Sequence, residues 1–459
     1  MFINRKEEKE VIEKRLNSPG FEFFILYGRR RIGKTSLVLE AIKERQHIYY
    51  LATEKDNLRK FAEHCALKFP ELANYRQDWE VIFDFLKGKA DIIVLDEFQN
   101  FIAEDRSFLS LLQKIIDSSL SRSGLKLFIL GSSVSMLDSA VLSYKSPLYG
   151  RKTGSLKLRQ MDLFDSAEFF QKRSMQELVE IHGFAGGVPY YLIKIDRPFW
   201  HWLSEELKRM DSFLKNETHF IMKYEFSDIG TYSLILEAIA RGRTTIGEIK
   251  DFARLKRTDV SPYLQKLIST DFISRETPII EKKNSRNSRY FINDQFVSFW
   301  YRFIYPNLSS IEERVFDARG ITANYNEYLG FVFEKACLQF LLRKIRAGEL
   351  DYLRVGRQWG RIPSEFRPEQ GKEQYEIDLV ALNDKKKEVL FAECKWKGDV
   401  DAERIARELN AKAKYVLWNN KSRKEVLAVF AKSFSRKITE FEGKKVMCFG
   451  LKDFENVLN

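Results

Sequence analysis

The sequence predicts an α/β protein of several domains, the first of which is built on a mostly parallel sheet. Its 459 residues exceed what one domain usually holds. Three short apolar runs, FEFFILY (21–27), DIIVLDEF (91–98) and LKLFILGSS (125–133), are separated by helical patterns. Strands that alternate with helices usually form a parallel sheet. A hydrophobic fraction of 44% supplies enough apolar side chains for packed cores, which excludes wholesale disorder.

The first half of the chain begins with a strand, a loop and a helix. The run 21–27 ends at Gly28, and the helical pattern SLVLEAIKE follows a basic loop flanked by glycines. The runs 91–98 and 125–133 supply two further strands, with the helical pattern FLSLLQKIIDSSL between them. From residue 156 to 225 the pattern is helical and interrupted by GFAGGVPYYL. We expect this region to form a helical lid on the α/β domain.

The second half of the chain predicts two more domains. Between residues 228 and 294 come three short helical patterns, a strand, a polar basic loop and a second strand, SRYFIND, an order typical of a winged helix. The aromatic stretch FVSFWYRFIYPN leads out of it. A new α/β unit then runs from a mixed segment near Gly320 to Asn459.

Charge and composition narrow the classes of partner and compartment. The formal charge of +12 favours a polyanion such as nucleic acid or nucleotide. The N-terminus lacks an apolar signal region and no run approaches the roughly 18 apolar residues of a membrane span, so we expect a cytoplasmic protein without a membrane partner. Four scattered cysteines without a C-x-x-C pair argue against a disulfide framework, and the five histidines show no zinc-ligand spacing. The four cysteines are Cys65, Cys337, Cys394 and Cys448.

The loop GRRRIGKT fits the phosphate-binding pattern G-x-x-x-x-G-K-[ST] and lies between a predicted strand and a predicted helix, as the pattern requires. Its glycines let backbone N–H groups turn toward phosphates, Lys34 reaches the β- and γ-phosphate oxygens, and the Thr35 hydroxyl suits the Mg²⁺ shell. The expected cofactors are therefore ATP or ADP with Mg²⁺. The expected contacts are Gly28, Arg29, Arg30, Arg31, Ile32, Gly33, Lys34, Thr35 and Ser36.

Two carboxylates end the second strand, at the edge of the sheet where the phosphate loop would lie. Four apolar residues, IIVL, run into Asp96 and Glu97. Since the carboxyl ends of parallel strands meet at one edge of a sheet, Asp96 suits water-mediated Mg²⁺ binding and Glu97 suits polarising the attacking water. The alternative is a pair of solvated carboxylates at a strand end.

These motifs, with ILGSS, YGR and GGVPYYL after them, resemble the archaeal-type ATPases of the AAA+/STAND group of P-loop NTPases. The resemblance covers about the first half of the chain. It implies that Ser132 or Ser133 senses the γ-phosphate, that Arg151 is a sensor or finger, and that Pro189 lies near the base. The opening FINRKEE is similar to the adenine-side segment of STAND proteins, which implies contacts from Ile3, Asn4 and Arg5.

The predicted winged helix is the most basic part of the chain. Nine basic and four acidic residues lie between Arg254 and Arg289. A recognition helix followed by a basic wing would place side chains on DNA phosphates. The expected contacts are Lys266, Lys282, Lys283, Arg286 and Arg289. The alternative is that the winged helix is an intramolecular packing module, as it often is in STAND-type ATPases.

The C-terminal part contains charged side chains within apolar strands. In VLFAECKW, Glu393 and Lys395 lie two residues apart and so share one face of the strand. Asp378, in the strand IDLVAL, could pair near Glu393, and two such carboxylates can hold Mg²⁺ with a lysine beside the scissile phosphate. Upstream, a helical pattern places Glu334 on an apolar stripe of Phe331, Leu338, Leu341 and Ile345, where an unpaired carboxylate is costly.

Glu334, Asp378 and the ECK triplet resemble the PD-(D/E)xK nuclease-like fold, over roughly the last third of the chain. The order also resembles the C-terminal domain that accompanies archaeal-type ATPases, with an FW dipeptide at Phe299 and Trp300 and a G-x-x-W-G-like segment at 356–360. The resemblance implies that Asp378 and Glu393 bind metal, that Lys395 stabilises charge, and that Glu334 supports the metal shell. The alternative is a buried salt-bridge network in a scaffold that only binds.

The sequence thus predicts a P-loop NTPase sheet with a helical lid, a winged helix and a restriction-endonuclease-like domain. The expected function is an ATP-hydrolysing, DNA-binding protein with a metal-dependent nuclease-like domain, in which further copies of the chain are one expected partner. The alternative is a STAND-type nucleotide-dependent switch whose C-terminal domain does not cleave. The expected domains are an ATPase core (1–155), a lid (156–225), a winged helix (226–300), a linker (301–325) and a nuclease-like domain (326–459).

Overall fold

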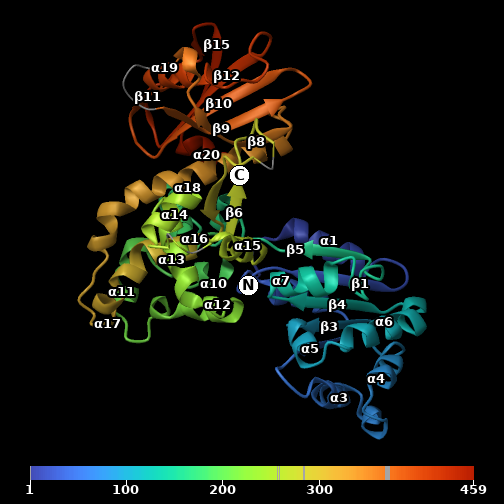
Figure 1. Ribbon diagram of the computed structural model, residues 1–459. Helices are drawn as coiled ribbons and strands as arrows, with labels where there is room; N and C mark the ends of the chain where they lie inside the picture. Colours follow the sequence, from blue (N-terminus) through green and yellow to red (C-terminus); the bar gives the residue numbers. More distant parts are fainter. Residues whose placement is uncertain (1, 256, 258, 283–284, 367–372, 459) are drawn as a thin grey trace. The chain divides into compact units, whose positions relative to one another are not determined.

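The structure is a computed structural model that describes residues 2–255, 257, 259–282, 285–366 and 373–458 (Figure 1). These residues form two compact units. The first unit consists of Met1–Gln160, Val188–Tyr190 and Ser269–Asp271, and the second of Met161–Gly187, Tyr191–Ile268 and Phe272–Asn459.

The first unit is built on a five-stranded sheet in which every pairing is parallel, with the order β2-β3-β4-β1-β5. Three of its strands are those that the sequence predicts. The edge strands β2 and β5 were not predicted, because they are short and only partly buried. The strands are β1 (Glu22–Tyr27), β2 (His47–Leu51), β3 (Ile92–Asp96), β4 (Lys126–Gly131) and β5 (Gly154–Lys157).

Helices cover both faces of this sheet, so the central strands are buried on both sides. In β1, Phe23 and Ile25 join one apolar cluster, and Phe24 and Leu26 join the other. A strand buried on both faces reads as a continuous apolar run, which is why FEFFILY was recognisable. The helices are α1 (Lys6–Leu16), α2 (Lys34–Ile42), α3 (Asn57–Lys68), α4 (Trp79–Leu86), α5 (Gln99–Glu104), α6 (Phe108–Ser118) and α7 (Val134–Leu137).

The helices that were expected to form a lid belong mostly to the second unit. There Phe184 on α9 makes edge-to-face contacts with Trp202, Phe296 and Phe299, so these helices share an aromatic core with later parts of the chain. Their amphipathic pattern indicated burial but could not indicate the partner. These helices are α8 (Leu163–Ala167), α9 (Met175–Ala185), α10 (Pro189–Leu192, shared with the first unit), α11 (Phe199–Lys208) and α12 (Glu217–Glu225).

Three helices and a two-stranded antiparallel hairpin follow, in the order that the sequence indicates for residues 228–294. The second helix begins with a capping box between Thr245 and Glu248, which satisfies the N–H groups of its first turn. The elements are α13 (Ile229–Ala240), α14 (Ile246–Phe252), α15 (Ser261–Ser269), β6 (Ile273–Glu276) and β7 (Arg289–Ile292). They continue into α16 (Gln295–Phe299), α17 (Leu308–Glu312) and the long α18 (Arg319–Arg346).

The chain ends in a six-stranded mixed sheet with the order β14-β15-β12-β10-β9-β8. The central strands β10 and β12 run parallel, whereas β8 and β9 form an antiparallel edge. Helix α19 packs on one face of this sheet. Helices α18 and α20 also contact the sheet. The elements are β8 (Arg354–Arg361), β9 (Gln374–Asn383), β10 (Glu388–Lys395), β11 (Val400–Asp401), α19 (Ala402–Ala413), β12 (Lys424–Ala431), β13 (Phe434–Arg436), β14 (Glu440–Phe441), β15 (Lys444–Phe449) and α20 (Leu451–Glu455).

The buried apolar face of helix α18 differs from the stripe that was expected beside Glu334. Phe331 is 45% exposed, and Leu338 and Ile345 are only partly buried. The buried face recurs instead at a helical period through Tyr325, Tyr328, Leu329, Val332, Phe333, Ala336, Cys337, Phe340 and Leu341. The sequence offered several apolar stripes on this 28-residue helix, and only tertiary packing selected one.

Two phenylalanines on α18 provide a matched test of this packing. Phe340 is fully buried against Phe430, Phe449 and Phe454. We expect Phe340→Ala to destabilise the second unit by about 3–5 kcal/mol, because it leaves a cavity. Phe331→Ala on the exposed face should cost less than about 1 kcal/mol. Denaturant unfolding of both variants measures the difference, and equal losses would contradict the assigned face.

Candidate functional site

The phosphate loop joins β1 to α2 and has the backbone that its glycines were expected to allow. Gly28, Arg31 and Gly33 have φ angles of 151°, 70° and 90°. At Gly28 a Cβ atom would lie 2.4 Å from the carbonyl oxygen of Leu158, so the loop has room for glycine alone. The loop is thus folded tightly at the carboxyl end of β1, directly before the helix.

Lys34 is buried at the start of α2 with a side chain that is 6% exposed. Its ammonium donates to the carbonyl oxygens of Gly28 at 2.9 Å and Arg29 at 3.0 Å. Burial lowers the pKa of Lys34 to about 8, although the carboxylates of Glu97 and Asp96 act in the opposite direction. A buried ammonium with neutral carbonyl partners is a strong attractor for an anion such as a phosphate group.

Thr35 and Asp96 meet at the edge of the sheet. The Thr35 hydroxyl donates to Oδ2 of Asp96 at 2.6 Å, and the Tyr49 hydroxyl donates to the same oxygen at 2.9 Å. Asp96 is only 2% exposed. The hydroxyl and carboxylate are hard oxygen ligands of the kind that Mg²⁺ prefers, so this pair could hold that ion. Tyr49 had not been singled out, because it lies on the unpredicted strand β2.

Glu97 follows Asp96 with a φ angle of 51°, in the left-handed region that is uncommon for glutamate. Its carboxylate accepts hydrogen bonds from Ser132 Oγ at 2.5 Å and from the side-chain amide of Gln99. Gln99 also donates to Ser132 Oγ at 3.0 Å. Ser132, expected to be a sensor, is thereby brought to Glu97, whereas Gln99 had been assigned no role. Its only sequence signal was its position two residues after Glu97.

Arg5 lies beside the phosphate loop and is 5% exposed. One guanidinium nitrogen donates to the carbonyl oxygens of Ile32 at 3.1 Å and Arg159 at 2.7 Å, and the other pairs with Glu8 at 2.7 Å. Arg5 therefore supports the backbone of the phosphate loop. The side chain of its neighbour Asn4 accepts a hydrogen bond from the Arg5 amide at 2.5 Å.

Two further residues suggested by the resemblance have different surroundings. Pro189 packs near the loop, with its ring 3.7 Å from the position that a Cβ on Gly33 would occupy. Arg151 forms a bidentate pair with Asp117 on α6, at 3.1 and 2.9 Å. Both members of this pair are substantially exposed. The structure therefore holds Pro189 at the phosphate loop and holds Arg151 on a carboxylate of a surface helix.

The basic residues that were expected to contact DNA differ in their surroundings. Lys282 and Arg286 are exposed, Lys266 on α15 is partly buried, and Lys283 lies outside the described residues. Arg289 is instead paired with Glu376 of β9 at 2.8 Å, and its guanidinium lies 4.7 Å from the ring centre of Trp359. The positive charge of Arg289 is thus paired within the second unit.

The segment between β6 and β7 packs on strand β8 of the C-terminal sheet. The Ile279 amide donates to the carbonyl oxygen of Arg357 at 2.9 Å, and Ile279 and Ile280 contact the apolar core of the sheet. The Trp359 indole N–H donates to the Asn287 side chain at 2.9 Å. The hairpin and the C-terminal domain are therefore joined by backbone, apolar and polar contacts.

Glu393 and Lys395 share the face of β10 that packs against α19, as the two-residue spacing predicts. The Glu393 carboxylate is 7% exposed and pairs with Lys395 at 2.7 Å. Lys412 on α19 also donates to it, at 2.9 and 3.0 Å to the two oxygens. Asp378 accepts from the Cys394 amide at 2.7 Å, which brings it beside β10. Lys412 was missed, because nothing in an amphipathic helix marks one lysine as facing a distant carboxylate.

Glu334 has a partner that the sequence did not reveal, Arg357 of β8, at 2.8 Å. Burial raises the pKa values of Glu334 and Asp378, and the negative charge of Glu393 raises both further. The three carboxylates are therefore close enough to interact electrostatically. Among the described residues, no group of three or more His, Cys, Asp or Glu side chains has the arrangement of a metal site. The positive charges of Lys395, Lys412 and Arg357 offset the negative charges of these carboxylates.

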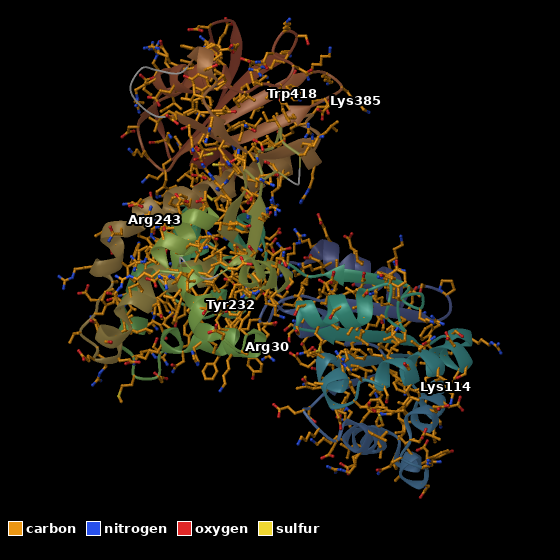
Figure 2. All side chains as sticks on the ribbon, in the orientation of Figure 1. Arg30, Lys114, Tyr232, Arg243, Lys385 and Trp418 are labelled. Atoms are coloured by element: carbon orange, nitrogen blue, oxygen red, sulfur yellow. The ribbon has the colours of Figure 1, made fainter. Side chains whose placement is uncertain are left out.

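The basic run at 385–387 lies on the exposed turn between β9 and β10. Figure 2 shows Lys385 at the outer edge of the sheet, pointing away from it. Lys386 pairs with Asp351 at 2.7 Å. The side chains of this run therefore face solvent and do not belong to the carboxylate cluster of β10.

The parallel sheet, the tight glycine loop, the buried Lys34 and the Thr35–Asp96 bond together define a nucleotide-binding ATPase of the P-loop class. Residues 2–195 match a family of ATPase domains found predominantly in Archaea. An uncharacterized protein of Methanocaldococcus jannaschii is 47% identical over 458 residues, which is 99% of this chain and all of that protein. The chain therefore belongs to the same family as that protein, and its residues 2–195 form an ATPase domain of the kind found predominantly in Archaea.

The other comparisons are with a second family, a further relative and a solved structure. Residues 300–406 match a family of archaeal and bacterial proteins of unknown function. An uncharacterized ATP-binding protein of M. jannaschii is 46% identical over 46 residues, 10% of this chain and 78% of that protein. The Walker-type ATPase of Pyrococcus abyssi shares the fold, with 21% identity, a TM-score of 0.51, and coverage of 65% of this chain and 96% of its own. Within the described residues, no helix has the length and apolarity to cross a membrane.

Arg5 offers a test of how the loop backbone is held. We expect Arg5→Ala to weaken ATP binding about tenfold, because the Ile32 and Arg159 carbonyls lose their shared donor and the loop can relax. Lys6→Ala, at the exposed neighbouring position, should bind ATP as the wild type does. Equilibrium titration with a fluorescent ATP analogue measures both, and unchanged binding by Arg5→Ala would contradict the supporting role.

Proposed function

We propose that the first unit hydrolyses ATP with Lys34, Thr35, Asp96 and Glu97 as its central residues. Lys34 would donate to the β- and γ-phosphate oxygens, in place of its present bonds to Gly28 and Arg29. The backbone N–H groups of the loop would surround the phosphates. The observation that supports this most is the Thr35–Asp96 bond, because it joins the phosphate loop to the acidic strand.

Thr35 and Asp96 would hold Mg²⁺, which supplies neutralisation of phosphate charge when bound. Glu97 would orient the attacking water and accept its proton. Ser132 and Gln99 hold the Glu97 carboxylate in the structure, so a γ-phosphate that bonds to Ser132 would change how Glu97 is held. Arg151 would act on nucleotide only after leaving Asp117.

Glu97→Gln tests the proposed base. We expect the variant to bind ATP normally but to hydrolyse it at least about a hundredfold more slowly, since the amide cannot accept the proton. Glu63→Gln, an exposed glutamate on α3, is the matched control and should retain the wild-type rate. A steady-state phosphate-release assay with bound nucleotide measured in parallel decides the matter, and wild-type turnover by Glu97→Gln would overturn the assignment.

We also propose that the C-terminal domain is a metal-dependent nuclease-like domain. The supporting observation is that Glu334, Asp378 and Glu393 are held near one another, although Asp378 and Glu393 raise the pKa of Glu334 and Glu393 raises the pKa of Asp378. Asp378 and Glu393 would hold a divalent cation, which supplies Lewis-acid stabilisation of a scissile phosphate when bound. Lys395 would stabilise developing negative charge, Lys412 would position Glu393, and Arg357 would position Glu334.

Cleavage by the full chain tests this second proposal. In the presence of Mn²⁺ or Mg²⁺, we expect Asp378→Asn to lower the rate of DNA or RNA cleavage at least about a hundredfold, because a cation ligand is lost. Asp384→Asn, at an exposed carboxylate paired with Arg354, should cleave as the wild type does. A wild-type protein that cuts neither nucleic acid, with or without ATP, would exclude the nuclease assignment.

The alternative, a STAND-type switch, is favoured by one observation. The hairpin expected to act as a DNA-binding wing is docked on β8, and Arg289 is paired with Glu376. In this form Lys282 and Arg286 remain exposed for DNA phosphates, but the wing is partly an intramolecular packing module. ATP hydrolysis stimulated by duplex DNA would support the DNA-binding function, whereas slow turnover with retained ADP would support the switch.

A further inference from the structure

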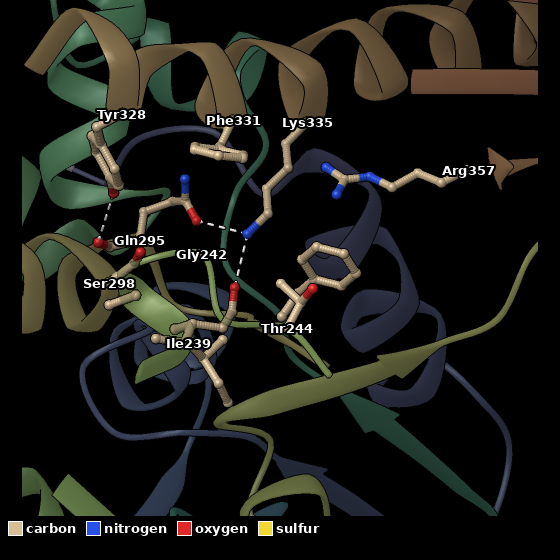
Figure 3. Close-up of a pocket in the computed structure, with 12 residues that line it drawn as sticks. Ile239, Gly242, Thr244, Gln295, Ser298, Tyr328, Phe331, Lys335 and Arg357 are labelled. Atoms are coloured by element: carbon tan, nitrogen blue, oxygen red, sulfur yellow. Dashed lines mark hydrogen bonds between the residues drawn. The ribbon is translucent and has the colours of Figure 1, made fainter. Parts of the chain in front are cut away.

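A pocket in the second unit adjoins the carboxylate cluster described above and shares Arg357 with it. It opens between the end of α13, strand β7, helix α16 and helix α18, with Arg357 of β8 at its inner end (Figure 3). Its cavity volume is about 60 Å³. Since one water needs about 10–15 Å³ of such space, the cavity accepts a group of roughly four to six non-hydrogen atoms.

The inner end of the pocket is cationic. The Lys335 ammonium donates to the carbonyl oxygen of Ile292 and to the side-chain oxygen of Gln295, both at 2.8 Å (Figure 3). These acceptors are neutral, and among the described residues no ion pair joins Lys335 to a carboxylate. An ammonium has three protons, so two bonds leave it with capacity for another acceptor. A buried ammonium with neutral partners is stabilised by an anion.

Arg357 adds a second positive charge at the same end. Its guanidinium pairs with Glu334 at 2.8 Å and lies 4.5 Å from the ring centre of Phe291. Glu334 therefore forms its ion pair with Arg357, whereas the carboxylates of Glu276, Asp294 and Glu334 act on Lys335 only without an ion pair among the described residues. Figure 3 shows the two side chains converging on the pocket from α18 and from β8.

The rest of the pocket is mostly apolar, although Thr244, Ser298 and Tyr328 also line it. Ile239, Ala240 and Phe291 line it, and Phe331 stands at the mouth with 45% of its surface exposed. An apolar wall cannot satisfy the outward oxygens of inorganic phosphate, and each unsatisfied oxygen would carry a desolvation cost. The combination suits an anion with a short apolar tail. The exposed Phe331, which fits no core in this structure, then gains a function as part of a ligand contact.

We propose that this pocket binds a short-chain organic carboxylate. The carboxylate accepts hydrogen bonds from Lys335 and Arg357, and the alkyl group packs between Ile239 and Phe331. Because α18 also carries Glu334, and Phe291 belongs to the docked hairpin, the ligand contacts the elements that connect the hairpin to the C-terminal domain. The pocket residues belong to the second unit, whereas the residues of the nucleotide site belong to the first.

Isobutyrate, with six non-hydrogen atoms, is the probe for the experiment, and inorganic phosphate is the second arm. Binding to the full-length protein is followed by saturation-transfer NMR and by titration calorimetry. We expect saturable isobutyrate binding that Lys335→Met weakens at least tenfold, since methionine keeps the length of the side chain and removes its charge. Lys344→Met, on the same helix and paired with Glu349, should bind as the wild type does.

A second variant keeps the test decisive if Lys335→Met does not fold. Thr244 lies at the pocket and is partly buried, so Thr244→Leu should fill the space without changing the charge. We expect it also to weaken isobutyrate binding at least tenfold at an unchanged melting temperature. No saturable isobutyrate binding by the wild type, wild-type affinity in Thr244→Leu, or tighter binding of phosphate than of isobutyrate would each overturn the proposal.

Discussion

The hydrogen bond from Thr35 to Asp96 is the constraint on which the first unit depends. It ties the first turn of α2 to the end of β3, two elements that are about sixty residues apart in the chain but adjacent at the carboxyl edge of a parallel sheet. The same edge places Ser132, at the end of β4, beside Glu97. The polar residues at this edge sit on a backbone that the buried strands β1, β3 and β4 hold in place.

The charges around this edge are balanced so as to favour an anion. Lys34 is buried with carbonyl partners, and burial lowers its pKa, so a nearby anion would stabilise its charged form. Glu97 is in turn held by Ser132 and Gln99. All of these residues lie within the range 2–195 that matches the ATPase family. The structure adds the bonds by which Arg5 and Tyr49 hold the loop and the aspartate.

In the second unit, the carboxylates of the C-terminal cluster have cations beside them. Lys395 and Lys412 share Glu393, and Arg357 pairs with Glu334. Truncating one member of such a pair leaves the other charge buried and is strongly destabilising. Arg357 also contacts Phe291 of the hairpin, so the carboxylate cluster and the hairpin share one side chain. This link is the physical basis for treating hairpin, pocket and cluster as neighbouring parts of one domain.

The sequence by itself determined the phosphate loop, the central strands and the Glu393–Lys395 face, because each depends on residues close together in the chain. A contiguous motif fixes its own backbone, and a two-residue spacing fixes a strand face. Only the tertiary structure decided that Lys412 faces Glu393, that Arg357 faces Glu334, that Arg289 is paired and that Phe331 is exposed. These depend on strand register and on which stripe of a long helix packs, and such choices follow from contacts between distant segments.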